Sequence, residues 1–295
     1  MSVASIGLSD EALDERRKGI GASDVAGILG VDPWRSPWDV WADKRGLVEP
    51  WKGNQATKIG QYLERAVIDY AEAELGSLAR NVRVPYLGGN PVVATLDALT
   101  EDGNPVEIKT AGMTGPLAPY WGDAGTDQIP EHYLCQVHTQ LLCTGADMAF
   151  LYALLGGRGI VRYEIPRHDD LCETLADTLL EWWDRHIVHG EEPSREKASL
   201  DIVKRFRRVP EKVVGLGDDL RFLLASKENL AAEAKDIKER QEECDKQLLL
   251  ALGDAEVGMF ADGTKVSYLE QHRKGYTVEP SSYRVLRIAK AKVKK

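Results

Sequence analysis

Cysteine is scarce in this sequence, and its four copies show no shared arrangement. Cys135, Cys143, Cys172 and Cys244 are scattered along the chain, and no two of them form a C-x-x-C pair. This spacing argues against a zinc ribbon, a thioredoxin motif and a disulfide scaffold. We therefore expect four buried or idle thiols.

Long hydrophobic runs are missing as well. No uncharged apolar stretch approaches the roughly 18 residues that a membrane-spanning helix requires. The first residues lack the basic-then-apolar pattern of a signal peptide. With 43% hydrophobic and 29% charged residues, the composition is that of a folded globular protein rather than a disordered or collagen-like one. We expect a cytoplasmic protein with no membrane partner.

Positive charge is short overall, since the net charge of the 295 residues is −9. This looks wrong for a nucleic-acid-binding protein, because contacts to phosphates depend on Lys and Arg. The charge is uneven, however: residues 281–295 hold six Lys or Arg and no acid, and a second basic group lies at Lys204, Arg205, Arg207 and Arg208. An acidic chain can bind nucleic acid locally or carry metal-binding carboxylates. Composition therefore leaves the partner open.

Residues 11–50 predict two helical pieces. Ser23 and Asp24 precede an apolar run, which is typical of a capped helix start. Trp34, Trp38 and Trp41 then follow at helical spacing. Such a stripe more often packs in a core than serves as a platform on which bases stack.

Beyond residue 60, the hydrophobic periodicity alternates between helices and strands. A helix that ends at Gly76 precedes three strands in an antiparallel meander, and a second helix leads to a strand pair and a third helix. This order predicts the α/β class, with a mixed sheet flanked by helices. The expected ranges are 61–75, 81–87, 91–100, 105–110, 131–143, 148–155, 160–165 and 169–188.

Two further segments differ in character from the rest. The Gly- and Pro-rich stretch 112–130 predicts a mobile or substrate-lining loop. Residues 218–252 predict a long polar helix with a narrow apolar seam, which a β-rich tail follows. We place a domain boundary near residue 195, so that one domain spans 1–194 and a C-terminal helical and β-rich extension of unknown role spans 195–295.

Three charged residues carry the chemistry. Residues two apart on a strand point to the same face, so Glu107 and Lys109 project together. Asp97 lies on the preceding strand, and an antiparallel neighbour can bring its carboxylate near Glu107. Two acids and a lysine on one sheet face predict a divalent-metal site with a general base or a charge stabiliser beside it. The alternative is an ordinary cross-strand ion pair, and Glu64, at the margin of an apolar helix stripe, favours the metal site because a carboxylate there needs a partner.

Five ordered segments together resemble the lambda-exonuclease, or YqaJ-type viral recombinase, family of phage alkaline exonucleases within the PD-(D/E)xK nuclease superfamily. They cover roughly residues 15–190, and their order carries more weight than any one of them. The resemblance implies a restriction-endonuclease-like core. The segments are RKGIGASDVAGILG (17–30), GQYLERAVIDYAEAELG (60–76), ATLDALTEDGNPVEIKT (94–110), IPEHYLCQVHTQLLCTGAD (129–147) and LYALLGGRGIVRYEIPR (151–167).

The resemblance also implies a role for each catalytic residue. Asp97, Glu107 and the main-chain carbonyl of Ile108 would bind Mg²⁺, for which Mn²⁺ can substitute. Lys109 would orient and activate the attacking water, and Glu64 would support a second metal ion. Two metal ions stabilise the attacking and leaving oxygens of an in-line phosphodiester hydrolysis.

DNA contacts are implied in the same way. Arg17 and Ser23 resemble the residues that hold the 5′-phosphate of the cut strand, with Arg16 as an equally near alternative. A helix start also suits an anion on physical grounds. Tyr133 and Gln136 match the Y-x-x-Q of the family, and Gln140 follows one turn later. His138 stands where a glutamine is frequent, which favours a structural role for it.

The function we expect is Mg²⁺-dependent 5′-to-3′ digestion of one strand of linear double-stranded DNA, which leaves a 3′ overhang for phage-type recombination. The implied partners are double-stranded DNA ends, further copies of the chain in a ring trimer, and a single-strand annealing recombinase, in a bacterial or phage-infected cell. One alternative is a RecB-like or Cas4-like nuclease that cuts single strands or acts as an endonuclease. Another is a DNA-binding module without turnover.

Overall fold

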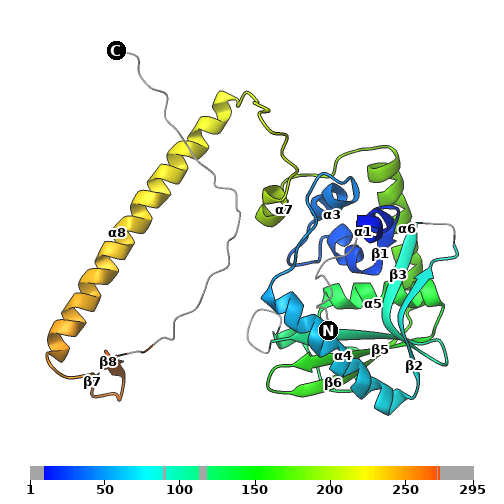
Figure 1. Ribbon diagram of the computed structural model, residues 1–295, viewed down its shortest axis with the longest axis horizontal. Helices are drawn as coiled ribbons and strands as arrows, with labels where there is room; N and C mark the ends of the chain where they lie inside the picture. Colours follow the sequence, from blue (N-terminus) through cyan, green and yellow to red (C-terminus); the bar gives the residue numbers. More distant parts are fainter. Residues whose placement is uncertain (1–9, 89–90, 113–117, 271, 273–295) are drawn as a thin grey trace. The chain divides into compact units, whose positions relative to one another are not determined.

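The computed structural model describes residues 10–88, 91–112, 118–270 and 272. It divides the chain into two compact units, Met1–Lys212 and Val213–Lys295 (Figure 1). The division falls after Lys212, and the helix Leu200–Lys204 buries Ile202 in the core of the first unit. Phe206 also forms a β-bridge with Val48 there. The domain boundary near residue 195 stays a prediction.

A mixed sheet forms the centre of the first unit. Strands β2, β3 and β4 make the expected antiparallel meander, β4 pairs in parallel with β5, and β5 pairs antiparallel with β6. The short β1 lies parallel to the start of β3. The predicted α/β class and mixed sheet are therefore confirmed. The strands are β1 (Ile20–Gly21), β2 (Leu78–Pro85), β3 (Val92–Thr100), β4 (Pro105–Ala111), β5 (Met148–Leu155) and β6 (Gly159–Pro166).

Helices cover both faces of this sheet, as Figure 1 shows. Val67 and Ile68 of α4 pack with Val106 and Ile108 of β4, whereas α5 packs on the opposite side of β5. Smaller helices from the N-terminal segment and α6 build a further core against β3. The helices are α1 (Asp10–Arg17), α2 (Val25–Leu29), α3 (Pro37–Lys44), α4 (Gln55–Leu75), α5 (Glu131–Thr144), α6 (Asp169–Trp183) and α7 (Leu200–Lys204).

The N-terminal segment departs from expectation at two residues. Ser23 does not cap a helix: it is exposed within a 3₁₀ turn, Ala22–Asp24, and Asp24 instead accepts the N–H of Gly21 at 3.0 Å. Trp38 and Trp41 of α3 are buried as predicted. Trp34 is 61% exposed, because it precedes Pro37, where α3 begins, and so falls off the helical stripe.

The described part of the 112–130 loop is tied to the sheet. Gly125 donates its N–H to the carbonyl of Arg162 at 2.9 Å, and Glu164 donates to Thr126 at 3.1 Å. Trp121 and Ile129 are buried in the core beside α5. This part is thus an anchored loop along β6, and residues 113–117 of the predicted loop lie outside the described residues.

The second unit contains the predicted long helix and a β-hairpin. A 3₁₀ turn, Asp218–Leu220, leads into α8 (Arg221–Leu252), and β7 (Val257–Met259) pairs antiparallel with β8 (Lys265–Ser267). The helical and β-rich extension is confirmed to that extent. The third predicted strand and the basic segment 281–295 lie outside the described residues. Within the described chain, none of the helices combines the length and the apolar character needed to cross a bilayer.

Candidate active site

Glu107 is the centre of a buried polar cluster between β4 and α5. It lies on β4, where period-two alternation places it on the same side as Lys109, and only 3% of it is exposed. Its carboxylate accepts hydrogen bonds from the Lys109 ammonium, from the Gln136 amide at 2.7 Å and from the Gln140 amide. The predicted pairing of Glu107 with Lys109 is therefore present, and α5 adds two amide donors to it.

Asp97 reaches the same cluster from β3. Its Oδ2 accepts the main-chain N–H of Ile108 at 2.8 Å, which ties the carboxylate to the strand that carries Glu107. The partner strand β2 is irregular at this level: Arg80 pairs with Ala98, Val82 pairs with Leu96, and Asn81 between them has a φ of 55°. Burial, followed by the charge of Glu107, raises the pKa of Asp97 to about 8. The two carboxylates therefore interact electrostatically, as a shared cation site requires.

Lys109 is held as a cation. Burial by itself lowers the pKa of Lys109, but the charges of Glu107 and then Asp97 outweigh it and raise that pKa above its usual value. Its ammonium also lies 5.0 Å from the centre of the Tyr133 ring, within range of a cation–π contact. In this arrangement Lys109 can donate hydrogen bonds and stabilise negative charge, whereas a proton-accepting role would require it to lose its proton.

Glu64 of α4 lies beside the cluster without a hydrogen bond to it among the described residues. Burial, followed by the charge of Glu107, raises the pKa of Glu64, so the field of Glu107 reaches it. Glu64 also lines a pocket of about 490 Å³ with Gln61, Arg65 and Arg80. The structure thus brings Glu64, the third predicted carboxylate, within electrostatic range of Glu107.

The donor chemistry of this cluster fits a hard divalent cation. Asp97, Glu107 and the carbonyl of Ile108 supply oxygen, the ligand type that Mg²⁺ prefers. Mutual repulsion of the two carboxylates is relieved by a cation between them. Among the described residues, no three His, Cys, Asp or Glu side chains stand together as a ready-made metal cage. Here Glu107 is instead hydrogen-bonded to Lys109 and to the two glutamines.

The glutamines of α5 point to Glu107 rather than to the surface. Gln140 is fully buried, and its position leaves no access for the DNA contact that the resemblance implied. Gln136 is partly buried and donates its amide N–H to Glu107. Sequence reasoning missed this role, although the i, i+4 spacing of the two glutamines places both on one face of α5.

The aromatic and histidine side chains nearby form a second layer. Tyr133 packs against His132 with ring centres 3.9 Å apart, and His132 meets the exposed Trp34 edge-on at 5.4 Å. His138 is fully buried, as a structural histidine should be, and its Nδ1 lies 3.1 Å from the Leu134 carbonyl. The Trp34–His132–Tyr133 row connects the surface to Lys109 and was not expected.

Arg17 and Ser23 lie apart from these contacts. Arg17 pairs with Asp14 at 2.8 Å and donates to the carbonyl of Asp43 at 3.4 Å, and in the described part of the chain neither Arg17 nor Ser23 bonds to the Glu107 cluster. The turn that carries Ser23 is anchored by Asp24, which pairs with Lys44 at 2.6 Å and Arg35 at 3.0 Å.

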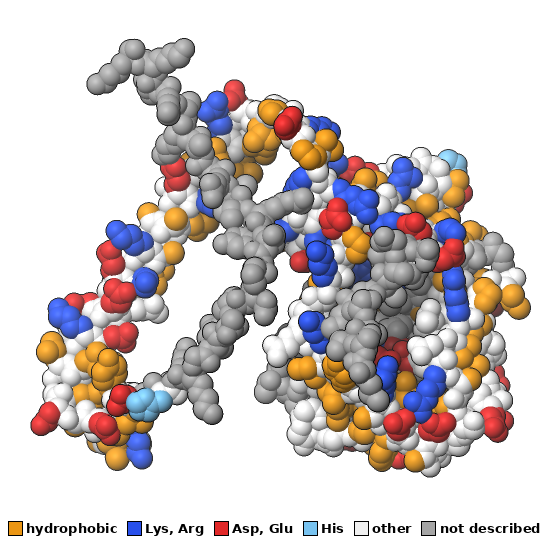
Figure 2. Space-filling view, viewed as in Figure 1, with side chains coloured by type: hydrophobic (Ala, Val, Ile, Leu, Met, Phe, Trp, Pro, Cys, Tyr) orange, Lys and Arg blue, Asp and Glu red, His pale blue; other side chains and the backbone are white. Residues whose placement is uncertain are grey.

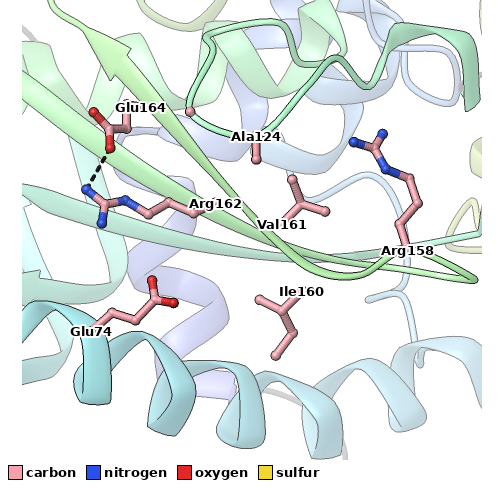
Figure 3. Close-up of a pocket in the computed structure, with 8 residues that line it drawn as sticks. Glu74, Ala124, Arg158, Ile160, Val161, Arg162 and Glu164 are labelled. Atoms are coloured by element: carbon pink, nitrogen blue, oxygen red, sulfur yellow. Dashed lines mark ion pairs between the residues drawn. The ribbon is translucent and has the colours of Figure 1, made fainter.

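A larger pocket, of about 640 Å³, lies on β6 away from the predicted site residues. Figure 3 shows Arg162 paired with Glu164 on one side and Arg158 on the other. The Arg158 guanidinium donates to the carbonyls of Trp121 and Gly122. The two arginines that line this pocket, Arg158 and Arg162, therefore already have partners. We assign the pocket no role in the chemistry.

Comparison with known proteins places this cluster in a family context. Residues 12–147 match the model of the YqaJ-like viral recombinase domain. The "Uncharacterized protein YqaJ" of Bacillus subtilis is 27% identical over 263 residues, which cover 86% of this chain and 81% of that protein.

Two solved structures show a likeness at low identity. The alkaline exonuclease LHK-Exo from Laribacter hongkongensis is 16% identical, with a TM-score of 0.48 over 61% of this chain and 94% of that chain. A putative exonuclease from Eubacterium rectale is 13% identical, with a TM-score of 0.47 over 73% of this chain and 97% of that one. The matched stretch 12–147 contains Glu64, Asp97 and the whole Glu107 cluster. Residues 12–147 of this chain are therefore similar to the YqaJ-like viral recombinase domain.

Proposed function

We propose that this protein is a metal-dependent deoxyribonuclease that digests one strand of linear double-stranded DNA from 5′ to 3′ and leaves a 3′ overhang for recombination. The observation that carries the proposal is the convergence of Asp97, Glu107 and Lys109 between β3, β4 and α5. The family supports it, and the alkaline exonuclease named above is one of the proteins that this chain resembles.

Each residue of the cluster has a role in this mechanism. Asp97, Glu107 and the carbonyl of Ile108 would hold Mg²⁺, or Mn²⁺ in its place, and Glu64 would support a second ion. Bound there, the metal lowers the pKa of water and offsets charge on the phosphate. Lys109, as a cation, would orient the attacking water and stabilise the developing negative charge. Gln136 and Gln140 would fix the carboxylate of Glu107 in one orientation.

The DNA end requires further contacts, which we place on the N-terminal segment. Arg17 and the exposed Ser23 would hold the 5′-phosphate, because a guanidinium offers charge-assisted hydrogen bonds to an anion. Asp24, fixed by Lys44 and Arg35, would position the turn that presents Ser23. Tyr133 would contact the DNA strand from beside Lys109.

The assembly we propose is a ring trimer around the duplex that works with a single-strand annealing recombinase. A ring with basic groups confined to its lumen reconciles the net charge of −9 with DNA binding. A monomer by light scattering at micromolar concentration, both with and without DNA, would contradict the ring.

Two other functions remain as alternatives. A RecB-like or Cas4-like nuclease would act on single strands or cut internally. The Cas4-like type usually holds an iron–sulfur cluster through cysteines, and no such group of thiols occurs among the described residues. A non-catalytic DNA-binding module would tolerate loss of a catalytic side chain, yet Asp97, Glu107 and Lys109 are all present.

The decisive experiment follows linear duplex DNA labelled at the 5′ or the 3′ end, with Mg²⁺ or with EDTA. We expect mononucleotide release from 5′ labels only, and only with the metal. Glu107→Gln and Lys109→Ala should each lower turnover by orders of magnitude, and the double variant should lose little more, because the residues act as a unit. The matched control is Glu101→Gln in the exposed turn before β4. Near-normal cleavage by Lys109→Ala would refute the assignment.

A further inference from the structure

Helix α8 of the second unit presents its side chains to solvent along its whole length. It contains 32 residues, about 48 Å of helix, and none of its side chains is buried. Most of the stability of a helix in a protein comes from packing of its apolar face rather than from intrinsic propensity. Within the described part of residues 213–295, that face has no cover.

The uncovered face follows a heptad repeat. Its apolar positions step by three and four residues, which is the 3.5-residue period of coiled coils rather than the 3.6-residue period of a globular helix. Leu230 is 64% exposed and Ile237 is 53% exposed. Figure 2 shows mixed charges along the middle of α8 and apolar side chains at its ends. The repeat starts at Leu220, in the turn before α8, and continues along α8 with Leu223, Leu230, Ala234, Ile237, Cys244, Leu248 and Ala251.

Polar residues interrupt the repeat at one kind of position. Lys227 and Gln241 occupy two of the a positions, in the register that puts Leu230, Ile237 and Cys244 at d. In coiled coils a polar a residue reduces stability and fixes register and strand number. On a helix that docked onto a dry protein core, the same residues would be buried without partners.

The charged residues that flank the apolar face of α8 indicate which helix pairs with it. In a parallel, in-register pair, a g residue of one helix meets the e residue five places later on the other. Glu233 then meets Lys238 of the second copy, and Arg240 meets Asp245 of the second copy, so both pairs attract. Residues five apart on one helix are not neighbours, so this pattern has no use within a single copy. Lys238 and Arg240 do pair within their own helix, with Glu242 at 3.6 Å and Asp236 at 3.8 Å, in exposed and therefore weak contacts.

We propose that α8 pairs in parallel and in register with α8 of a second copy of this chain. The charge complementarity of the g and e positions selects this occupant, and the proposal does not depend on the nuclease activity or on the ring. It gives the second unit the role of joining copies of the first.

Cys244 provides a direct test, because parallel in-register pairing brings it opposite Cys244 of the second copy. A short bis-maleimide added to the full-length protein should join the two thiols, and Cys244→Ser should abolish that dimer. In an antiparallel pair centred on the middle of α8, near residue 236, the same thiols would lie about 24 Å apart along the axis. Absence of a Cys244-dependent dimer at tens of micromolar protein would overturn the proposal.

Charge reversal tests the partner. Glu233→Lys should weaken association by roughly tenfold, since two symmetry-related pairs become repulsive, and Lys238→Glu should do the same. The double variant Glu233→Lys/Lys238→Glu should restore the cross-linked dimer, because the pairs attract again. The control is Glu239→Lys on the outer face, which should leave the yield unchanged, and circular dichroism checks that each variant stays helical. Failure of the double variant to restore cross-linking, with helicity intact, would refute parallel self-pairing and leave docking onto the first unit or another protein.

Discussion

At the scale of single residues, the site is organised around the carboxylate of Glu107. Lys109 from the same strand and Gln136 and Gln140 from α5 all donate to it. Three donors on one carboxylate restrict its rotation. Asp97 lacks such support: its single described hydrogen bond comes from the Ile108 N–H, and burial raises its pKa. The two carboxylates therefore differ in how many hydrogen bonds fix their orientation.

We predict that Gln140→Leu lowers kcat by about 10- to 100-fold while KM for DNA stays nearly constant. The substitution removes a donor to Glu107 from a position that DNA cannot reach. Steady-state kinetics and a Mg²⁺ titration of activity measure both effects, with Gln128→Leu on the exposed loop as the control. A change confined to KM would indicate instead that Gln140 acts on the substrate.

The buried Asp24 gives a prediction about stability and pH. Burial alone raises the pKa of Asp24, but the charges of Lys44 and Arg35 outweigh it and hold that pKa well below its usual range. A carboxyl with a lowered folded-state pKa contributes stability above about pH 4, and this contribution is lost as the pH falls further. Asp24→Asn should therefore lower the free energy of unfolding by about 3–5 kcal/mol at pH 7.

Urea unfolding at pH 7 and at pH 3.5 checks this prediction. The difference between wild type and Asp24→Asn should narrow at the lower pH. Asp43→Asn is the matched control, since its contact with Arg35 is longer, at 3.9 Å, and partly exposed, and it should cost less than about 1 kcal/mol. A pH-independent difference would show that Asp24 does not act through its charge.

At the scale of elements, the packing of α5 on the sheet positions the side chains around Glu107. It packs on β5 through Val137 and Leu141, and this contact brings its glutamines over β4. The antiparallel meander positions Asp97, because the pairing of β3 with β4 through Ala98 and Val106 places Asp97 opposite Glu107. The short helix α2 is almost wholly buried and packs against α5.

We predict that Arg17→Ala slows digestion of 5′-phosphorylated ends more than that of 5′-hydroxyl ends. The guanidinium would lose its contact with the phosphate only where a phosphate exists. Initial rates on the two substrates give the ratio, and Lys18→Ala, the exposed neighbouring cation, is the control. Equal slowing on both ends would remove Arg17 from the phosphate site.

At the scale of the whole molecule, charge and function are divided along the chain. Apart from residues 281–295, the protein carries a net charge of −15, while those 15 residues carry +6. The acidic part contains the cluster that we assign to chemistry, and the basic part lies beyond α8. Positive charge is therefore concentrated in the last 15 residues of the chain.

We predict that removing residues 282–295 shortens each run of digestion per binding event. Loss of six cations should also make the salt dependence of DNA binding shallower, because fewer counterions are released. A processivity assay with competitor DNA and binding measured across salt concentrations check both effects. Unchanged run length and salt slope would mean that the segment is a solvated tail.

Local sequence was sufficient for much of this protein, because strand alternation and turn residues act over a few positions. Period-two patterning placed Glu107 and Lys109 on one face, and Gly76 ended α4 as predicted. The sequence also predicted the heptad spacing of α8, because the pattern repeats along a single helix. In each case the pattern depends only on residues close together in the chain.

Tertiary structure decided the rest, where the partner of a side chain comes from far along the chain. Gln140 bonds to Glu107 only because α5 packs over β4, and the buried Asp24 pairs with Lys44, which lies 20 residues away in the chain. Ile202 belongs to the first unit because its side chain packs in the core there. Periodicity specifies which face of an element is apolar, but not which distant element covers that face, and packing alone makes that choice.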